Sequence, residues 1–318
     1  MALQPHRSTW STPAQSPHAL LLDALCEAFA HVPRSEWLAR MQAGLVTDSA
    51  GRALNAEELF APQQHVHYSR SVPNEATIPV QERIVFENEV IVVADKPHFL
   101  PVMPSGGYVR ETLLWRLQQK LNCPDLVPAH RIDRDTAGLV LFIKQRQHRG
   151  AYQNLFRDRL VEKSYLALAP DDAAFPPELQ LHNWLQTSPA HFMQMECLPC
   201  NDVGAVNAST TIKKIAAQAA LTAKNGEKAL NNQALYLLQP RTGLRHQLRV
   251  QMAALGLPIA NDGLYPIVTP ECAAPHLQPA LQLLAWRLGF VDPLTKQALQ
   301  WQSQLQLDCD WSAVAALK

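Results

Sequence analysis

A run of charged residues placed directly before a strand of apolar residues constrains this chain most. His130-Arg131-Ile132-Asp133-Arg134-Asp135-Thr136-Ala137-Gly138 leads into Leu139-Val140-Leu141-Phe142-Ile143. The apolar run predicts a strand buried on both faces, and hence a core sheet with the charged cluster at its mouth. Asp133, between Arg131 and Arg134, is a candidate nucleophile or ligand-orienting group. On charge alone, a surface salt-bridge turn is the simpler explanation.

The chain as a whole divides into four stretches. Residues 1–17 are rich in Ser, Pro and Gln and predict a disordered tail. Residues 18–70 predict a small N-terminal α/β module, with helices over 18–31 and 36–43 and short strands at 45–47 and 65–68. Residues 71–80 form a polar linker with two prolines. Residues 81–318 then predict the main domain.

Within the main domain, the pattern predicts both strands and helices. Strands are expected at 90–94, 139–143 and 161–168, and helices at 112–121 and 150–159. The weakest pattern lies in residues 170–235. Strand-like pieces occur there at 192–195 and 208–215, and an Asn225-Gly226 turn suggests a hairpin.

Composition excludes several classes of protein. No apolar run approaches the roughly 18–20 residues that a membrane span needs, and residues 1–15 lack the apolar core of a secretory signal. Six cysteines scattered over 318 residues indicate reduced thiols rather than a disulfide framework. We therefore expect a cytoplasmic protein with no membrane partner, and a monomer.

Basic residues concentrate near the charged motif, although 28 Lys+Arg balance 28 Asp+Glu. A nucleic-acid binder usually carries an excess of basic residues, so the zero net charge argues against RNA binding. The clustering of the basic residues argues for it. Eight basic and four acidic residues lie between Arg131 and Lys163, and Arg241, Arg245 and Arg249 follow without a nearby acid. A solvated helix face bearing Arg157 and Arg159 explains part of this pattern.

Metal and cofactor chemistry has little support in the sequence. Cys197-Leu198-Pro199-Cys200 is a lone CxxC, whereas a structural zinc site needs four ligands, so no metal site is predicted. A metal- or thiol-dependent hydrolase using Cys197, Cys200 and His191 is an alternative that rests on this motif alone. The chain has no Walker loop and no GxGxxG, and we expect no cofactor.

Three motifs, in order along the chain, resemble those of the RluA-like pseudouridine synthases. The charged segment is similar to His-Arg-Leu-Asp-x-x-Thr-Ser-Gly-Leu, and residues 163–167 are similar to Lys-x-Tyr-x-Ala. Residues 241–252 and 255–265 resemble Thr-Gly-Arg-x-His-Gln-Ile-Arg-Val-His and Leu-Gly-x-Pro-Ile-x-Gly-Asp-x-x-Tyr. The departures that matter are Leu244-Arg245 in place of Arg-x, and Gln251 in place of a histidine. The resemblance runs from about Val90 to Pro293.

The resemblance implies a cofactor-free RNA pseudouridine synthase and assigns roles to individual residues. The catalytic residues are then Asp133, Tyr165, whose ring stacks on a flipped uracil, and Arg249, which pairs with Asp133. Asp135 is interpreted as structural. The candidate substrate-binding residues come from the same motifs and are His130, Arg131, Arg134, Thr136, Arg245, His246 and Gln247.

The implied fold is α+β: a pseudouridine synthase fold with a long, mainly antiparallel mixed sheet and flanking helices, which makes 81–318 the catalytic domain. Residues 18–70 resemble in pattern the α-L RNA-binding module, with a thin basic face of Arg34, Arg40 and Arg52; a helical cap without an RNA role is the alternative. The module favours structured RNA, above all 23S rRNA, as the partner. A tRNA synthase of the same fold and a non-catalytic RNA-binding protein are the alternatives.

Overall fold

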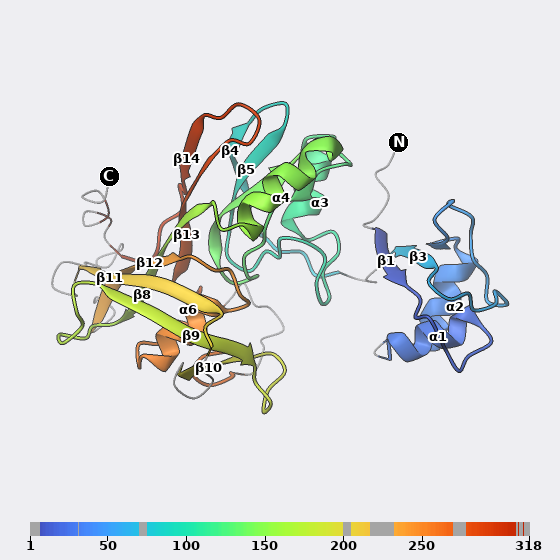
Figure 1. The fold of residues 1–318 in the computed structure, drawn as a ribbon, viewed down its shortest axis with the longest axis horizontal. Helices are drawn as coiled ribbons and strands as arrows, with labels where there is room; N and C mark the ends of the chain where they lie inside the picture. The colour runs from blue at the N-terminus through green and yellow to red at the C-terminus, as the bar shows by residue number, and fades with distance from the viewer. Residues whose placement is uncertain are drawn as a thin grey trace. The chain divides into compact units, whose positions relative to one another are not determined.

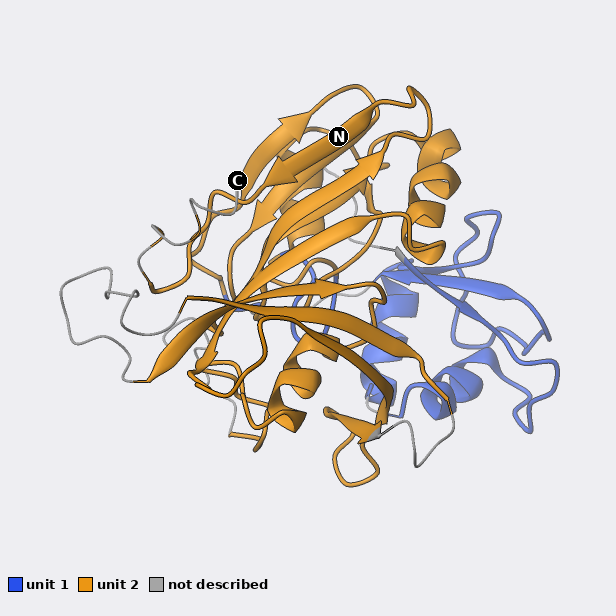
Figure 2. Ribbon diagram, turned by 60° about the vertical axis from the view of Figure 1, so that its left-hand side comes forward, with its two compact units in different colours: residues 1–76, 104–110 blue, residues 77–103, 111–318 orange. Residues whose placement is uncertain are grey.

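The computed structural model describes residues 7–30, 32–69, 75–199, 205–216, 232–269 and 278–309, together with Trp311 and Val314. The chain divides into two compact units (Figure 2). The first comprises residues 1–76 and 104–110, and the second residues 77–103 and 111–318. None of the helices in the described ranges has the length and hydropathy that crossing a bilayer requires.

The first unit combines two helices with a three-stranded antiparallel sheet. The helices α1 (Leu21–Ala28) and α2 (Arg34–Gln42) lie where the sequence predicts them. The sheet has the order β1-β3-β2, and its strands are Arg7–Ser11, His65–Ser69 and Val46–Thr47. Both helices and the sheet contribute to one core, which includes Leu21, Leu25, Trp37, Val46 and Val66, all without exposed surface.

The prediction of a disordered tail over residues 1–17 is wrong for Arg7–Ser11. These residues form β1, which pairs with β3 from Arg7↔Ser69 to Ser11↔His65. The ring of Trp10 packs edge-on against that of Phe29, with centroids 5.8 Å apart. A strand that joins an existing sheet takes its hydrogen-bond partners from that sheet, and the polar composition of a tail does not reveal such partners.

The arginines expected to form a basic face on this unit are paired with carboxylates. Arg34 and Arg40 form ion pairs with acidic residues of α1 and α2. Arg52 contacts Asp48 at 3.0 Å and Glu58 at 2.9 Å. Such pairs reduce the positive potential that RNA phosphates would meet. An α-L RNA-binding role for residues 18–70 stays a prediction.

The second unit is built on one eleven-stranded mixed sheet (Figure 1). Its order is β10-β9-β11-β12-β8-β13-β7-β5-β4, with β14 paired to β13 and β6 to β7. Among the described strands every pairing is antiparallel except that of β13 with β7, which confirms the predicted fold class. The strands are β4 (Arg83–Glu87), β5 (Ile91–Lys96), β6 (Val127–Pro128), β7 (Ala137–Ile143), β8 (Glu162–Pro170), β9 (Leu179–Thr187), β10 (Met195–Pro199), β11 (Ala208–Ala216), β12 (Gln233–Pro240), β13 (Leu283–Val291) and β14 (Ala298–Gln302).

The second unit also contains helices. They are α3 (Leu113–Lys120), a 3-10 turn η1 (Arg146–His148), α4 (Arg149–Arg157) and α6 (Gln247–Ala254). Tyr152 and Leu155 of α4 pack with residues of β5, β7 and β13. Leu248 and Met252 of α6 pack with residues of β8, β11 and β12. The helices expected at 112–121 and 150–159 are thus present as α3 and α4.

Two regions differ from the sequence-based expectation. Ile78, in the predicted linker 71–80, is 4% exposed and its amide donates to Glu111 Oε2 at 2.8 Å, so this end of the segment packs into the second unit. The strand expected at 192–195 forms a few residues later, as β10. The strand β9 was not predicted, because its polar residues have a low propensity for strands. The Asn225-Gly226 turn lies outside the described residues.

Candidate active site

The strand β7 presents Asp133 from the loop before its first residue. All seven residues of β7 are buried, which confirms the predicted two-sided core strand. Gly138 has a φ of +115°, and a Cβ built on it would lie 2.2 Å from the carbonyl oxygen of Ala285 in β13. The two backbones approach so closely that only glycine fits. This contact fixes the point from which the Asp133 loop departs.

A buried lysine holds the same loop from the end of β5. Lys96 has no exposed surface, and its Nζ donates to the carbonyl oxygens of Arg134 at 2.8 Å and Pro97 at 2.9 Å. Burial lowers the pKa of Lys96 to about 7, against the opposing charges of Asp135 and Asp133. The backbone beside Asp133 is therefore tied to the core sheet.

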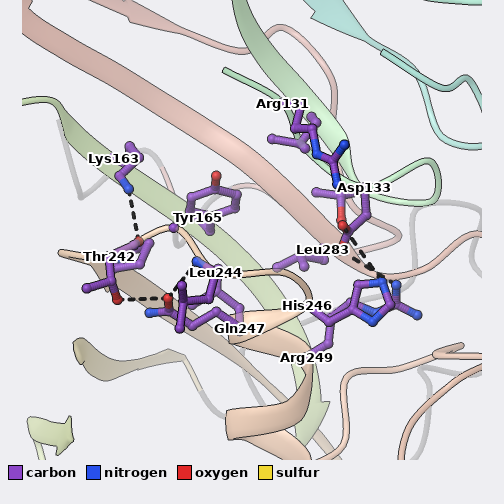
Figure 3. A pocket seen from close by; sticks show the side chains of 15 residues that line it. Arg131, Asp133, Lys163, Tyr165, Thr242, Leu244, His246, Gln247, Arg249 and Leu283 are labelled. Atoms are coloured by element: carbon purple, nitrogen blue, oxygen red, sulfur yellow. Dashed lines mark hydrogen bonds and ion pairs between the residues drawn. The ribbon is translucent and has the colours of Figure 1, made fainter. Parts of the chain in front are cut away.

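The guanidinium of Arg249, on α6, lies between two carboxylates. Its Nε and Nη2 donate to Asp262 Oδ2 and Oδ1 at 2.8 and 2.6 Å, and its Nη1 lies 3.6 Å from Asp133 Oδ2 (Figure 3). Burial works against the charge, but hydrogen bonding to Asp262 outweighs it, so the pKa of Arg249 rises above its ordinary value. Arg249 is thus a rigidly held cation with one nitrogen directed at Asp133.

His246 faces the other oxygen of the same carboxylate. Its Nε2 lies 3.9 Å from Asp133 Oδ1, and its Nδ1 lies 3.0 Å from Tyr265 Oη. Burial lowers the pKa of His246 below its ordinary value, although Asp133 acts in the opposite direction. The ring is therefore neutral near pH 7, and Asp133 faces a cation on one side and an imidazole on the other.

Asp133 lines a pocket of about 490 Å³, open solvent at its mouth included. Tyr165 and Lys163 of β8 and the turn Thr242–Leu244 line it as well (Figure 3). Burial and the charge of Asp133 raise the pKa of Tyr165, so the phenol keeps its proton. Burial lowers the pKa of Lys163 to about 8, and its Nζ donates to Thr242 O at 3.0 Å. A ligand in this pocket can therefore contact the carboxylate of Asp133, the ring of Tyr165 and the ammonium group of Lys163.

Most of the predicted site residues come together in this pocket. Thr136 is 2% exposed, and its hydroxyl has no hydrogen-bond partner in the described part of the chain. Gln247, by contrast, uses its amide within the protein: it accepts from Thr242 Oγ1 at 2.8 Å and donates to Thr210 Oγ1 at 2.9 Å. The predicted residues that line the pocket are Arg131, Asp133, Thr136, Tyr165, His246, Gln247 and Arg249.

Two predicted residues of the charged motif do not line the pocket. His130 stacks on Phe156, with ring centroids 4.3 Å apart, and its Nε2 accepts from the Leu141 amide at 3.2 Å. Burial lowers the pKa of His130 to about 3, so the ring is neutral. Arg134 donates from Nε to Asp135 Oδ1 at 3.0 Å. Both side chains make contacts within the protein that support the loop.

The departures from the family pattern around α6 have distinct places in the structure. Leu244 lines the pocket, whereas Arg245 donates from Nη2 to Met193 O at 2.8 Å and does not line it. The structure therefore does not bring Arg245 to Asp133. Gln251 has no exposed surface and donates to Asn183 Oδ1 at 3.0 Å, which ties α6 to β9.

A family model described as RNA pseudouridylate synthase matches residues 90–254, just over half of the chain. The chain belongs to this family. The match covers Asp133, Tyr165 and Arg249, the three residues expected to be catalytic. The protein is accordingly an RNA pseudouridine synthase, an isomerase that acts on RNA.

The synthase is similar to curated relatives from several organisms. It is 27% identical to an uncharacterized RNA pseudouridine synthase of Synechocystis over 90% of this chain and 94% of that protein. It is 30% identical to the tRNA pseudouridine(31) synthase of Saccharomyces cerevisiae, covering 71% of this chain and 53% of that protein. It is 27% identical to the ribosomal large subunit pseudouridine synthase D of Nitrosomonas europaea, covering 71% and 62%.

A solved structure shares the fold. Human RNA pseudouridylate synthase domain containing 1 superposes with a TM-score of 0.54 at 20% identity, covering 71% of this chain and 84% of that one. The agreement concerns the fold alone, and it supports the α+β architecture of the synthase.

Three residues of the synthase site had no role in the sequence-based prediction. Lys163 lines the pocket, Asp262 binds Arg249, and Tyr265 contacts His246. All three lie inside the motifs that carry the family resemblance, so the signal was present. A motif shows which residue types recur, but not which of them contact one another.

Cys197 of the CxxC packs against a cluster that contains Tyr265, but it does not line the pocket. Cys197 lies on β10, and Cys200 lies outside the described residues. Within the described ranges no group of three or more His, Cys, Asp or Glu residues could hold a metal ion. The hydrolase alternative thus gains no support.

Proposed function

We propose that the synthase isomerises specific uridines in structured RNA, with 23S rRNA as the first target, and that Asp133 is its catalytic carboxylate. The observation that carries the proposal is the position of Asp133. Its Oδ2 lies 3.6 Å from Nη1 of the buried Arg249, in a pocket that Tyr165 also lines. A carboxylate oriented by a fixed cation is prepared to act on a bound nucleotide.

Pseudouridine formation is an isomerisation, so atoms and electrons balance without a co-reactant. The bond between ribose C1′ and uracil N1 breaks, the base turns, and a bond forms between C1′ and C5. The hydrogen on C5 leaves and N1 gains one. Asp133 serves as nucleophile on the base or the sugar, or as base on the sugar; each route requires its carboxylate beside the nucleotide.

A uridine must leave its stack to reach such a pocket. Stacking on an aromatic ring is worth about 1–3 kcal/mol per base, which offsets part of the few kcal/mol that flipping costs. Tyr165 supplies the ring. Its hydroxyl keeps the proton because burial and the charge of Asp133 raise its pKa, so it can donate a hydrogen bond to the flipped base.

The remaining pocket residues suit contacts with the nucleotide. Arg131, an exposed cation, and Lys163 line the pocket together and suit the phosphates next to the flipped uridine. The hydroxyl of Thr136 is buried without a partner among the residues described, so a polar group of the nucleotide can satisfy it. His246 lies beside Asp133 and can contact the same nucleotide.

The names of the relatives point to two classes of RNA. The Nitrosomonas europaea protein is named for the large ribosomal subunit, and the Saccharomyces cerevisiae protein for position 31 of tRNA. We place 23S rRNA first because a small additional unit accompanies the synthase domain, and tRNA second. Pseudouridine mapping of total RNA from cells with and without the protein separates them: a site lost from tRNA alone would refute the rRNA target. Loss of no site would favour a non-catalytic RNA-binding role.

Asp133→Asn tests the catalytic role, because it keeps the shape of the side chain and removes its charge. We expect no pseudouridine by chemical mapping, with RNA affinity within about threefold of wild type and an unchanged melting temperature. Asp158→Asn, which makes the same change at a residue paired with Arg157 at the end of α4, is the matched control and should retain full activity. Turnover by Asp133→Asn at the wild-type rate would refute the assignment.

A further inference from the structure

His246 is held in a constrained conformation beside Asp133. Its backbone is left-handed, with φ 52° and ψ 18° at the N-cap of α6, which costs about 1–3 kcal/mol in a residue other than glycine. The side chain is 10% exposed, and its ring meets that of Tyr265 edge-on, with centroids 5.7 Å apart. Strain kept at the wall of a pocket points to a function for the side chain.

The hydroxyl of Tyr265 sets the direction of its hydrogen bond to His246. The oxygen accepts from the Met195 amide at 2.7 Å and lies 3.0 Å from His246 Nδ1; these are its two partners in the described part of the chain. Because the amide already donates to the oxygen, the hydroxyl hydrogen is left for Nδ1, which then carries a lone pair. The proton of the neutral ring therefore lies on Nε2.

Asp133 favours the same tautomer from the opposite edge of the ring. Nε2 lies 3.9 Å from Oδ1, where an N–H is attracted by the carboxylate and a lone pair is repelled. Arg249 Nη1 faces the other oxygen, Oδ2, at 3.6 Å (Figure 3). Each carboxylate oxygen thus faces one donor. Both distances exceed those of formed hydrogen bonds, which leaves room for them to shorten in the nucleotide complex.

Tyr265 is itself anchored by the carboxylate that holds Arg249. Asp262 Oδ1 accepts from the amides of Leu264 and Tyr265 at 2.8 and 3.1 Å, and both of its oxygens bind Arg249. The guanidinium of Arg249 also lies over the Tyr265 ring, 5.6 Å from its centroid. One buried carboxylate thus places both groups that face Asp133, the guanidinium directly and the imidazole through Tyr265.

We propose that Tyr265 is a positioning residue: its hydroxyl fixes His246 as the Nε2–H tautomer, so that His246 and Arg249 together orient the two oxygens of Asp133. This inference rests on the proposed catalytic role of Asp133. Orientation matters because a carboxylate oxygen that attacks a carbon or removes a proton must meet that atom at a defined angle. A ring with its lone pair on Nε2 would instead turn the carboxylate away.

The test reads the protonation of the ring nitrogens by nitrogen–proton NMR correlation in the 15N-labelled full chain. In wild type we expect the proton of His246 on Nε2 and a lone pair on Nδ1. Tyr265→Phe keeps the aromatic ring and removes the hydroxyl. We expect a mixture of tautomers and a kcat about tenfold lower, at an unchanged KM, as for the loss of one hydrogen bond to a functional group.

Two further variants separate this role from a merely structural one. Tyr152→Phe removes another buried hydroxyl, which donates to Asp292 Oδ2 at 2.8 Å, and should leave the His246 spectrum and kcat unchanged. His246→Gln places an amide N–H near the position of Nε2 and has no tautomers. In that background Tyr265→Phe should cost no further activity.

Two results would overturn the proposal: a proton on Nδ1 of His246 in wild type, or additive losses in the His246→Gln background. Failure of the proposed function is distinguishable from either. Activity in Asp133→Asn would refute the catalytic carboxylate, whereas the His246 spectrum reports the tautomer whether or not the enzyme turns over.

Discussion

Replacing Gly138 by alanine should damage both the stability and the site of the synthase. The residue has a φ of +115°, which an L-residue rarely adopts and which costs about 1–3 kcal/mol. The added Cβ would lie 2.2 Å from the oxygen and 2.6 Å from the nitrogen of Ala285. Relief of this overlap requires β13 to move by about 1 Å to reach ordinary contact. That shift weakens the parallel pairing of Leu284↔Ala137 and Ala285↔Gly138.

Added together, the strain and one or two weakened hydrogen bonds of about 1 kcal/mol each lower the free energy of unfolding by about 2–5 kcal/mol. Urea denaturation followed by far-UV circular dichroism measures this loss, and pseudouridine mapping measures activity. The overlap acts on β7 as well as on β13, and β7 carries the Asp133 loop. A displacement of about 1 Å at Asp133 should reduce turnover of the folded fraction by about a hundredfold.

Gly289→Ala is the matched control in the same sheet. A Cβ there lies 3.4 Å from its nearest neighbour, Leu299 O, which is ordinary contact. We expect stability within about 1 kcal/mol of wild type, because alanine is tolerated at this backbone conformation and is favoured over glycine in a strand interior. A Gly138→Ala protein as stable as Gly289→Ala would refute the close approach of β7 and β13.

Two further predictions concern buried polar groups. Thr136→Val should raise the free energy of unfolding by about 1 kcal/mol, because it removes a buried hydroxyl without a partner among the described residues, and it should lower kcat/KM about tenfold. The control Thr136→Ser should retain activity. Full kcat/KM in the valine variant would exclude a nucleotide contact. Lys96 has a pKa of about 7 in the folded chain against an ordinary 10.5. The unfolded chain therefore binds more protons between these values, and wild-type stability should rise with pH over this window relative to Lys96→Met, by about 5 kcal/mol. If the free energy of unfolding, measured by urea denaturation, changed equally with pH in wild type and in Lys96→Met, Lys96 would be charged in the folded state.

The local sequence was sufficient to predict an element where the burial of its residues follows from the apolar pattern of that element. The strand β7 is buried on both faces, and such a strand needs a continuous apolar run, so the pattern predicts it directly. The helices α3 and α4 show apolar residues at helical spacing for the same reason. The residues Asp133, Tyr165 and Arg249 were named through the resemblance of their motifs to those of the family, since the local pattern alone favoured a salt-bridge turn at Asp133.

Local pattern fails where distant parts of the chain supply the partners. The helix α6 buries Gln247, Arg249 and Gln251 as well as its apolar residues, so no polar face marks it as an amphipathic helix. Its buried polar groups are satisfied by Asp262 and by the sheet. The strand β1 depends in the same way on β3. The hydrogen-bond partners of both elements lie far away along the chain, so the local sequence does not show them.

Side-chain identity therefore decided what chemistry was available: a carboxylate, a phenol and a guanidinium in motifs of a recognisable order. The tertiary structure decided which of them meet. It directs His130, Arg134 and Arg245 to protein partners and adds Asp262 and Tyr265 to the surroundings of Asp133. The physical reason is that the direction of a side chain is set by its backbone, and the backbone by contacts such as that of Gly138 with Ala285, which join residues far apart in the chain.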